Sequence, residues 1–186
     1  MIAGRGECYP SAWSFILFES RMPAAVTAVM AGISLSVSGL LLQTVFHNPL
    51  AGPSVFGISS GSSLAVSLLM LTTGGTVATL GSTFGGQLSI VAAALAGAAV
   101  VMMLIISMSL VVRSNVMLLI IGMMTGYLAS SVISVLSYFA TEDGLQSFTI
   151  WGLGTFSNTT LSQLPAIILL TLLPTIAAIL CIKPLN

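Results

Sequence analysis

The chain has 186 residues, of which 56% are hydrophobic and 4% are charged, and its mean hydropathy is +1.14. Soluble domains carry roughly 25% charged residues, so this composition excludes a soluble globular protein and indicates an all-α, polytopic transmembrane bundle. Four Lys and Arg residues balance four Asp and Glu residues, which excludes the basic surface of a nucleic-acid-binding protein. The two cysteines, Cys8 and Cys181, lie near opposite ends and suggest neither a disulfide nor a metal cluster.

About five apolar segments are long enough to cross a membrane, because a helix needs about 20 residues to span the ~30 Å hydrocarbon layer. The predicted spans are residues 24–46, 55–71, 88–112, 116–139 and 161–182. The second is short, which predicts that it starts below the membrane surface. Between the last two spans, residues 140–160 are predicted to form a solvated outer linker that carries Glu142 and Asp143.

The few charged residues give an orientation. With five spans, His47, Arg113 and Lys183 fall on one side of the membrane, and Arg21, Glu142 and Asp143 fall on the other. Lys and Arg are enriched in cytoplasmic loops, so Arg113 and Lys183 favour their own side as cytoplasmic. Arg21 is then expected on the outer face.

Small residues recur at helical spacing within the spans. They are Gly32, Ser36 and Gly39 in the first, Ala93 and Gly97 in the third, and the G-x-x-x-G pair Gly122 and Gly126 in the fourth. Such spacing lets helix backbones approach closely. Two interpretations stay open: plain helix packing, or a glycine face of the fourth span that lines a pathway or moves.

A polar break separates the first two spans. Pro49 and Pro53 lack amide donors, while Gly52 and Gly57 permit turns. Asn48 is expected to cap exposed backbone groups. The serines Ser59, Ser60 and Ser62 are expected to satisfy the first turn of the next helix. The break is predicted to be a structural re-entry turn, with direct substrate contact as the alternative.

Several motifs point to one family. The block N-P-L-A-x-P-x-x-x-G-I-S-x-G runs from Asn48 to Gly61, preceded by Arg21-Met22-Pro23 and Gln43, and followed by Leu119-Ile120-Ile121-Gly122 and the segment from Trp151 to Ser157. Together they resemble the FecCD-type permease subunits of bacterial ABC importers for iron-siderophore, haem and cobalamin. The resemblance covers about residues 19–186.

The resemblance implies a type II ABC importer permease fold in the bacterial inner (plasma) membrane. Such permeases dimerise over two ATPase subunits and receive substrate from a periplasmic or surface-anchored binding protein. Relative to that pattern, the chain is expected to be a fragment that lacks the helix before Arg21 and the C-terminal half. The resemblance also implies that residues 140–160 form a short outer helix that shapes the substrate entrance.

Two sites follow from the resemblance. The family's R-x-P-R motif docks acidic residues of the binding protein, which places a partner-binding role on Arg21, although Ala24 stands where the second arginine is expected. Headgroup contact or pairing with Glu19 is the alternative for Arg21. Ser114 and Asn115 join the third and fourth spans, where the family narrows its pathway, and a simple turn is the alternative there.

The remaining polar residues receive structural interpretations. Gln43 and Gln87 are expected to make hydrogen bonds between helices, with pathway contact as the alternative. His47 has no neighbouring ligand residues, so no metal site and no cofactor are predicted.

No residue set supports catalysis, since the chain has no Walker lysine loop, no G-x-S-x-G and no H-E-x-x-H. The predicted function is a permease subunit for a metal chelate, most often an iron-siderophore, with haem or cobalamin as the alternative and ATP hydrolysis on a partner. A secondary transporter needs an ionisable residue within its spans, and the five predicted spans contain no Asp, Glu, Lys or Arg. An intramembrane enzyme would need a nucleophile and a base there.

Overall fold

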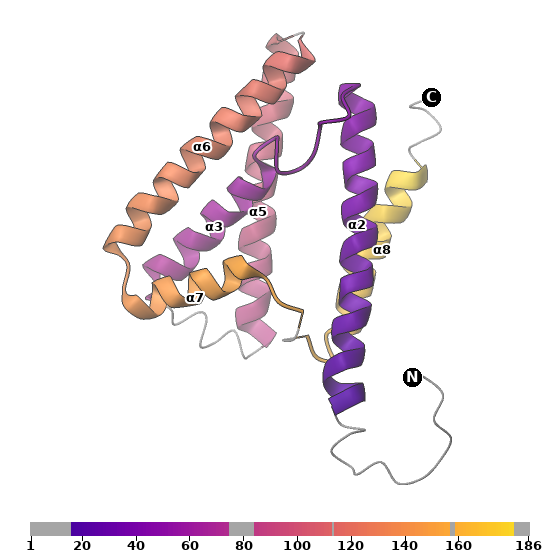
Figure 1. Cartoon of the computed structure of the whole chain (residues 1–186), viewed down its shortest axis with the longest axis vertical. Helices are drawn as coiled ribbons and strands as arrows, with labels where there is room; N and C mark the ends of the chain where they lie inside the picture. The colour runs from indigo at the N-terminus through magenta and orange to yellow at the C-terminus, as the bar shows by residue number, and fades with distance from the viewer. Residues whose placement is uncertain (1–15, 75–83, 113, 157–158, 181–186) are drawn as a thin grey trace. The chain divides into compact units, whose positions relative to one another are not determined.

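The computed structural model describes residues 16–74, 84–112, 114–156 and 159–180 (Figure 1). Within these ranges all regular structure is helical and no β-strand occurs, which confirms the predicted fold class. Some residues discussed above lie outside the described ranges. They are Cys8, Arg113, Ser157, Cys181 and Lys183.

Five helices lie in the segments of the five predicted spans, whose crossing of a membrane stays a prediction. They are α2 (Met22–Phe46), α3 (Ile58–Thr72), α5 (Phe84–Val111), α6 (Asn115–Phe139) and α8 (Leu164–Leu180). A short π-helix, η1 (Ile16–Arg21), precedes α2, and a short helix, α7 (Glu142–Leu153), lies between α6 and α8. Apolar runs bounded by polar or proline-rich segments thus predicted where these helices begin and end to within a few residues.

Among the described residues, three stretches are long and apolar enough to cross a membrane: Ile16–Phe46, Gly85–Val111 and Asn115–Phe139. The helices α3 and α8 are apolar but have only 15 and 17 residues. At 1.5 Å per residue α3 is roughly 22 Å long, which is shorter than the ~30 Å hydrocarbon layer. This length agrees with the expectation that the second crossing begins in the polar break.

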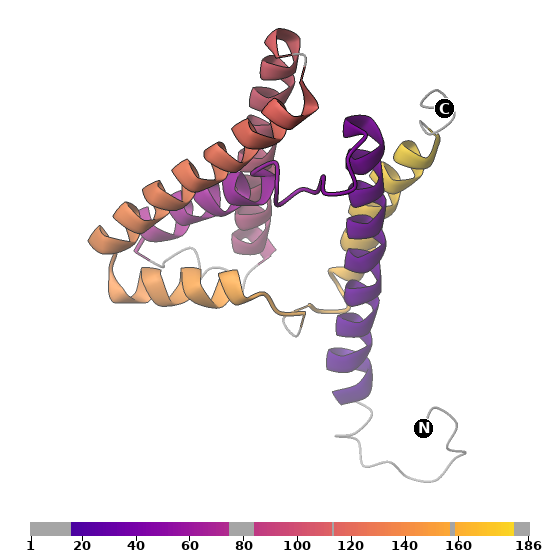
Figure 2. The same cartoon turned by 45° about the horizontal axis from the view of Figure 1, so that its top comes forward.

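The chain forms two units. The first combines Met1–Val37 with Thr155–Asn186, and the second is Ser38–Gly154. In the second unit α3 packs against α5, α6 and α7 (Figures 1 and 2). Its buried apolar cluster consists of Ala51, Phe56, Val101 and Ile105, against which Leu42, Phe46, Ile58 and Ile121 pack. The core therefore joins the end of α2, the break, α3, α5 and α6.

The crossing of α3 and α5 depends on two glycines. A Cβ atom on Gly61 would lie 2.8 Å from the carbonyl oxygen of Gly97, and one on Gly97 would lie 2.7 Å from the Cβ of Ala65. Nearby, the Ser62 hydroxyl donates a hydrogen bond to the Ala94 carbonyl at 2.9 Å. Close packing is therefore the role of Gly97.

The glycines of α2 differ from Gly97. A Cβ atom on Gly32 or Gly39 would meet no atom of the chain within 4 Å. Within the described residues, the spacing of small residues in α2 thus marks no close contact between helices.

Helix α7 corrects the prediction of a polar linker and confirms the short helix that the resemblance implied. The Thr141 hydroxyl caps the helix by accepting a hydrogen bond from the Gly144 amide at 3.3 Å. Glu142 and Asp143 lie in the first turn, where the helix dipole favours carboxylates, and both are exposed. Solvation of these two carboxylates, as expected from the sequence, is confirmed, although their backbone is helical.

Candidate functional site

The polar break folds into a turn that satisfies its own backbone. The Gln43 side chain donates a hydrogen bond to the Pro49 carbonyl at 3.1 Å, and the Asn48 side chain accepts one from the Leu50 amide at 2.9 Å. His47 adopts the left-handed conformation at φ 47° and turns the chain away from α2. The capping role of Asn48 is confirmed. Gln43 closes its own turn, so the expectation of a hydrogen bond to another helix was wrong.

The second half of the break leads directly into α3. The Ile58 amide donates to the Pro53 carbonyl at 3.1 Å, and Gly57 occupies the left-handed region at φ 72°. No side chain caps α3, so the expected capping by Ser59, Ser60 and Ser62 was wrong. The Phe56 ring is buried against Phe46, with 4.2 Å between their ring centroids.

This turn sits directly on the glycine pair of α6. A Cβ atom on Gly57 would lie 2.7 Å from the Gly122 carbonyl oxygen and 3.2 Å from the Gly126 nitrogen. A Cβ atom on Gly122 would lie 2.7 Å from the Cα of Phe56. The structure thus brings together the predicted turn residues and the predicted G-x-x-x-G face. Close packing explains the presence of glycine at Gly122 and Gly126, and their role in a pathway stays a prediction.

The connection between α5 and α6 reaches the same turn. The Ser114 hydroxyl caps α6 by accepting a hydrogen bond from the Met117 amide at 3.4 Å. The Asn115 side-chain amide donates to the carbonyl of Phe46, the last residue of α2, at 2.9 Å. Ser114 and Asn115 therefore lie beside the end of α2, where the polar break begins, whereas Gly57 at the far end of the break packs further along α6 on Gly122. No sequence pattern signalled the bond between Asn115 and Phe46.

The connections between the helices of this unit alternate between its two ends. The contact between Asn115 and Phe46 joins the connection after α2 to the connection after α5. The connection after α3 likewise meets the connection after α6, since a Cβ atom on Gly74 would lie 3.5 Å from the Thr141 hydroxyl. Figure 1 shows these pairs at opposite ends of α6. Which end faces the cytoplasm stays a prediction.

Arg21 belongs to the first unit and is a separate candidate. It is the last residue of η1 and is exposed. Glu19 lies two residues earlier, and helical residues two apart do not face each other. The geometry therefore does not favour pairing of Arg21 with Glu19, and the docking role of Arg21 stays a prediction.

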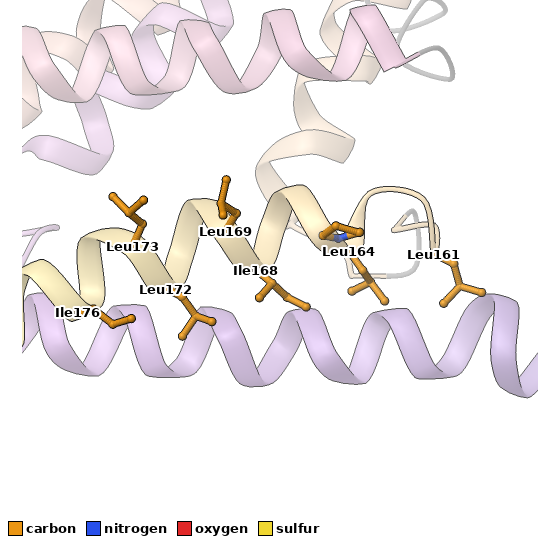
Figure 3. A pocket seen from close by; sticks show the side chains of 8 residues that line it. Leu161, Leu164, Ile168, Leu169, Leu172, Leu173 and Ile176 are labelled. Carbon is orange, nitrogen blue, oxygen red and sulfur yellow. The ribbon is translucent and has the colours of Figure 1, made fainter.

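The first unit also contains an apolar groove of about 610 Å³ along α8. Figure 3 shows Ile168 and Leu172 directed toward α2, whereas Leu169 and Leu173 point away from it. Ligand sites combine apolar walls with a few polar groups that orient the ligand. This groove is lined only by Leu, Ile and Pro side chains, so it has no side chain that could orient a polar chelate.

Comparison with known proteins identifies the family. The model of the FecCD transport family matches residues 4–186. The chain belongs to this family. Membership of this permease family, together with the three described helices that are long and apolar enough to span a membrane, confirms the predicted multi-pass location in the bacterial inner membrane.

Several curated relatives resemble this FecCD chain. It is 30% identical to the vitamin B12 import system permease protein BtuC of Pectobacterium atrosepticum, over 94% of the chain and 51% of the relative. It is 33% identical to the molybdate import system permease protein MolB of Haemophilus influenzae, over 80% and 42%. For a probable iron chelatin transport system permease protein of Helicobacter pylori, the identity is 30% over 79% and 41%.

A solved structure confirms the permease architecture. An inward-facing metal-chelate type ABC transporter superposes on this FecCD chain with a TM-score of 0.68 and 28% sequence identity. The match covers 87% of the chain and 50% of the solved chain. The chain spans about half the length of the curated relatives it matches.

Proposed function

We propose that this chain acts as a membrane permease subunit, or as a part of one, in an ATP-driven importer for a metal chelate. The observation that carries the proposal is the folded N-P-L-A-x-P-x-x-x-G-I-S-x-G block, whose Gly57 packs on Gly122 and Gly126 of α6. The three relatives named above, which are all import or transport permeases, support the same function. The chain would then be a transport component and not an enzyme.

Three partners follow from this function. A separate ATPase subunit would hydrolyse ATP, and a periplasmic or surface-anchored binding protein would deliver the chelate. A second permease copy would complete a homodimer around the pathway. Ser114, Asn115, Gly122 and Gly126 are our candidates for the region of the chain that borders this pathway, because Ser114 and Asn115 start α6 beside the end of α2, and Gly122 and Gly126 lie on the face of α6 that meets the re-entry turn.

An iron-siderophore is our first candidate for the cargo, and a probable iron chelatin permease among the relatives supports it. Vitamin B12 is the second candidate, because BtuC proteins of several bacteria are among the relatives. Both are large metal chelates. Haem stays a further possibility within the family resemblance.

Uptake measurements test the function. The gene product as encoded in its genome, reconstituted in vesicles with its ATPase and binding protein, is expected to accumulate a radiolabelled iron-siderophore when ATP is present. Labelled vitamin B12 and molybdate are assayed in parallel. Accumulation of vitamin B12 alone would replace the first cargo by the second. If none of the three labelled compounds accumulated although ATP was hydrolysed, the import function would be wrong.

The docking role of Arg21 predicts a charge-reversal effect. We expect Arg21→Glu to weaken binding-protein docking about tenfold and to reduce its salt dependence, because a guanidinium pairs strongly with carboxylates. Arg21→Lys is the matched control and should lose less affinity, and Ala24→Arg should increase affinity by restoring the second arginine. Surface plasmon resonance at two salt concentrations measures these changes. Equal affinity for Arg21→Glu and the original protein would rule out the role.

A further inference from the structure

Asn115 makes a contact that neither helix needs for its own formation. Its side-chain amide donates to the Phe46 carbonyl at 2.9 Å, across 69 residues of sequence. Phe46 ends α2, and the last carbonyls of a helix have no partner within that helix. His47, at φ 47°, turns the chain away at this point. Asn115 therefore supplies a C-terminal cap for α2 from the start of another helix.

The first turn of α6 has little other packing to hold it. Asn115, Val116 and Met117 are exposed, and the first buried residue of the helix is Leu118. Val112 and Ser114, on either side of the undescribed residue 113, are non-helical. Movement of the first turn of α6 relative to α2 is therefore restrained by the hydrogen bond of Asn115, ahead of the apolar contacts that begin at Leu118.

We propose that Asn115 is a reversible latch between α2 and α6, and thus a positioning residue rather than a residue that touches the cargo. A single exposed hydrogen bond has a modest net strength, so the ATP-driven cycle of partner subunits can break and remake it. With the latch closed, Ser114 stays beside the end of α2. With the latch open, the first turn of α6 moves while Gly122 stays seated on the re-entry turn. The gating role of this latch rests on the proposed import function.

The test compares an amide with a carboxylate. Asn115→Asp keeps the size of the side chain and removes the donor. Gln146→Glu is the matched control, because it makes the same change at an exposed position of α7. Spin labels are placed at Val45→Cys and Val116→Cys, which are 50% and 63% exposed, in a background in which Cys8 and Cys181 are serine. The genome-encoded protein is measured in nanodiscs by continuous-wave EPR.

The labelled protein with Asn115 intact is expected to give a spectrum dominated by strong dipolar broadening, because positions 45 and 116 adjoin the hydrogen-bonded residues Phe46 and Asn115. Asn115→Asp is expected to raise the ratio of separated to latched molecules roughly fivefold, the effect of one hydrogen bond of modest strength. Gln146→Glu should leave the spectrum unchanged. Equal spectra for Asn115→Asp and the unchanged protein would overturn the latch, as would an equal change in both variants.

Two further measurements keep the outcome decisive. If Asn115→Asp does not give monodisperse protein, Asn115→Leu removes the donor without adding a charge, and the same shift is expected. The EPR readout requires neither ATP nor cargo, so it separates the latch from the function. Absent uptake with the expected EPR shift would refute the import function alone, and an unchanged spectrum with normal uptake would refute the latch alone.

Discussion

Replacing Gly97 with alanine is expected to destabilise the second unit by roughly 3 kcal/mol, at the upper end of the range for overpacked cores. The added Cβ would lie 2.7 Å from the Ala65 Cβ and 2.8 Å from the Gly61 carbonyl carbon, so α3 and α5 must move apart. Their separation also strains the hydrogen bond between Ser62 and Ala94. A loss of stability in Gly97→Ala would be informative, because alanine is otherwise favoured over glycine inside a helix by about 1 kcal/mol.

The control for this prediction is Gly32→Ala, since a Cβ atom there meets nothing within 4 Å. Its apparent melting temperature should stay equal or rise, whereas that of Gly97→Ala should fall. Fluorescence-detected size-exclusion chromatography after stepwise heating measures both in detergent. A similar fall for the two variants would mean that the glycine crossing does not determine stability.

Gly57→Ala is expected to have a larger effect, of about 4 kcal/mol. Holding an L-residue in the left-handed conformation costs roughly 1–2 kcal/mol, and overpacking adds about 1–3 kcal/mol. Here φ is 72° and the new Cβ would lie 2.7 Å from the Gly122 carbonyl oxygen. Because the atom it meets belongs to the backbone of α6, no side chain can move to make room. Most of the protein should therefore fail to elute as a single species.

Two further variants identify why Gly57→Ala destabilises the protein. Gly52→Ala lies in the same turn, where a Cβ atom meets nothing within 4 Å, and it should behave like the original protein. Gly57→Asn tolerates the left-handed conformation better but keeps the clash, so it should also fail. Recovery of stability in Gly57→Asn would show that backbone conformation, and not the contact with α6, requires glycine.

Much of the fold was predictable because it depends on local chemistry. Long apolar runs set the bounds of α2, α5 and α6, since lipid accepts only helices that satisfy their own backbone. A turn at Gly57 was predicted from its place between a proline-rich break and a helix, and its left-handed φ confirms the turn. The capping role of Asn48 followed from its short side chain beside Pro49.

The contacts between distant segments were not predictable from the sequence. Asn115 bonds Phe46 only because helix packing brings the two connections together, and no periodicity reports which helix ends adjoin. The same spacing of small residues gave close packing at Gly97 but open space at Gly32. Helix α7 was missed by composition because its capping threonine and acidic first turn also suit a solvated linker.

The brevity of α3 has a consequence for biogenesis. Five of its fifteen residues are serine, and its length falls short of a membrane crossing. A translocon recognises segments by their own apolarity, so α3 is a poor candidate for independent insertion. We expect α2, α5 and α6 to enter the bilayer first. Helix α3 would then insert when Gly61 packs against Gly97 of α5. The contact between α3 and α5 would therefore be needed for membrane insertion as well as for the stability of the folded protein.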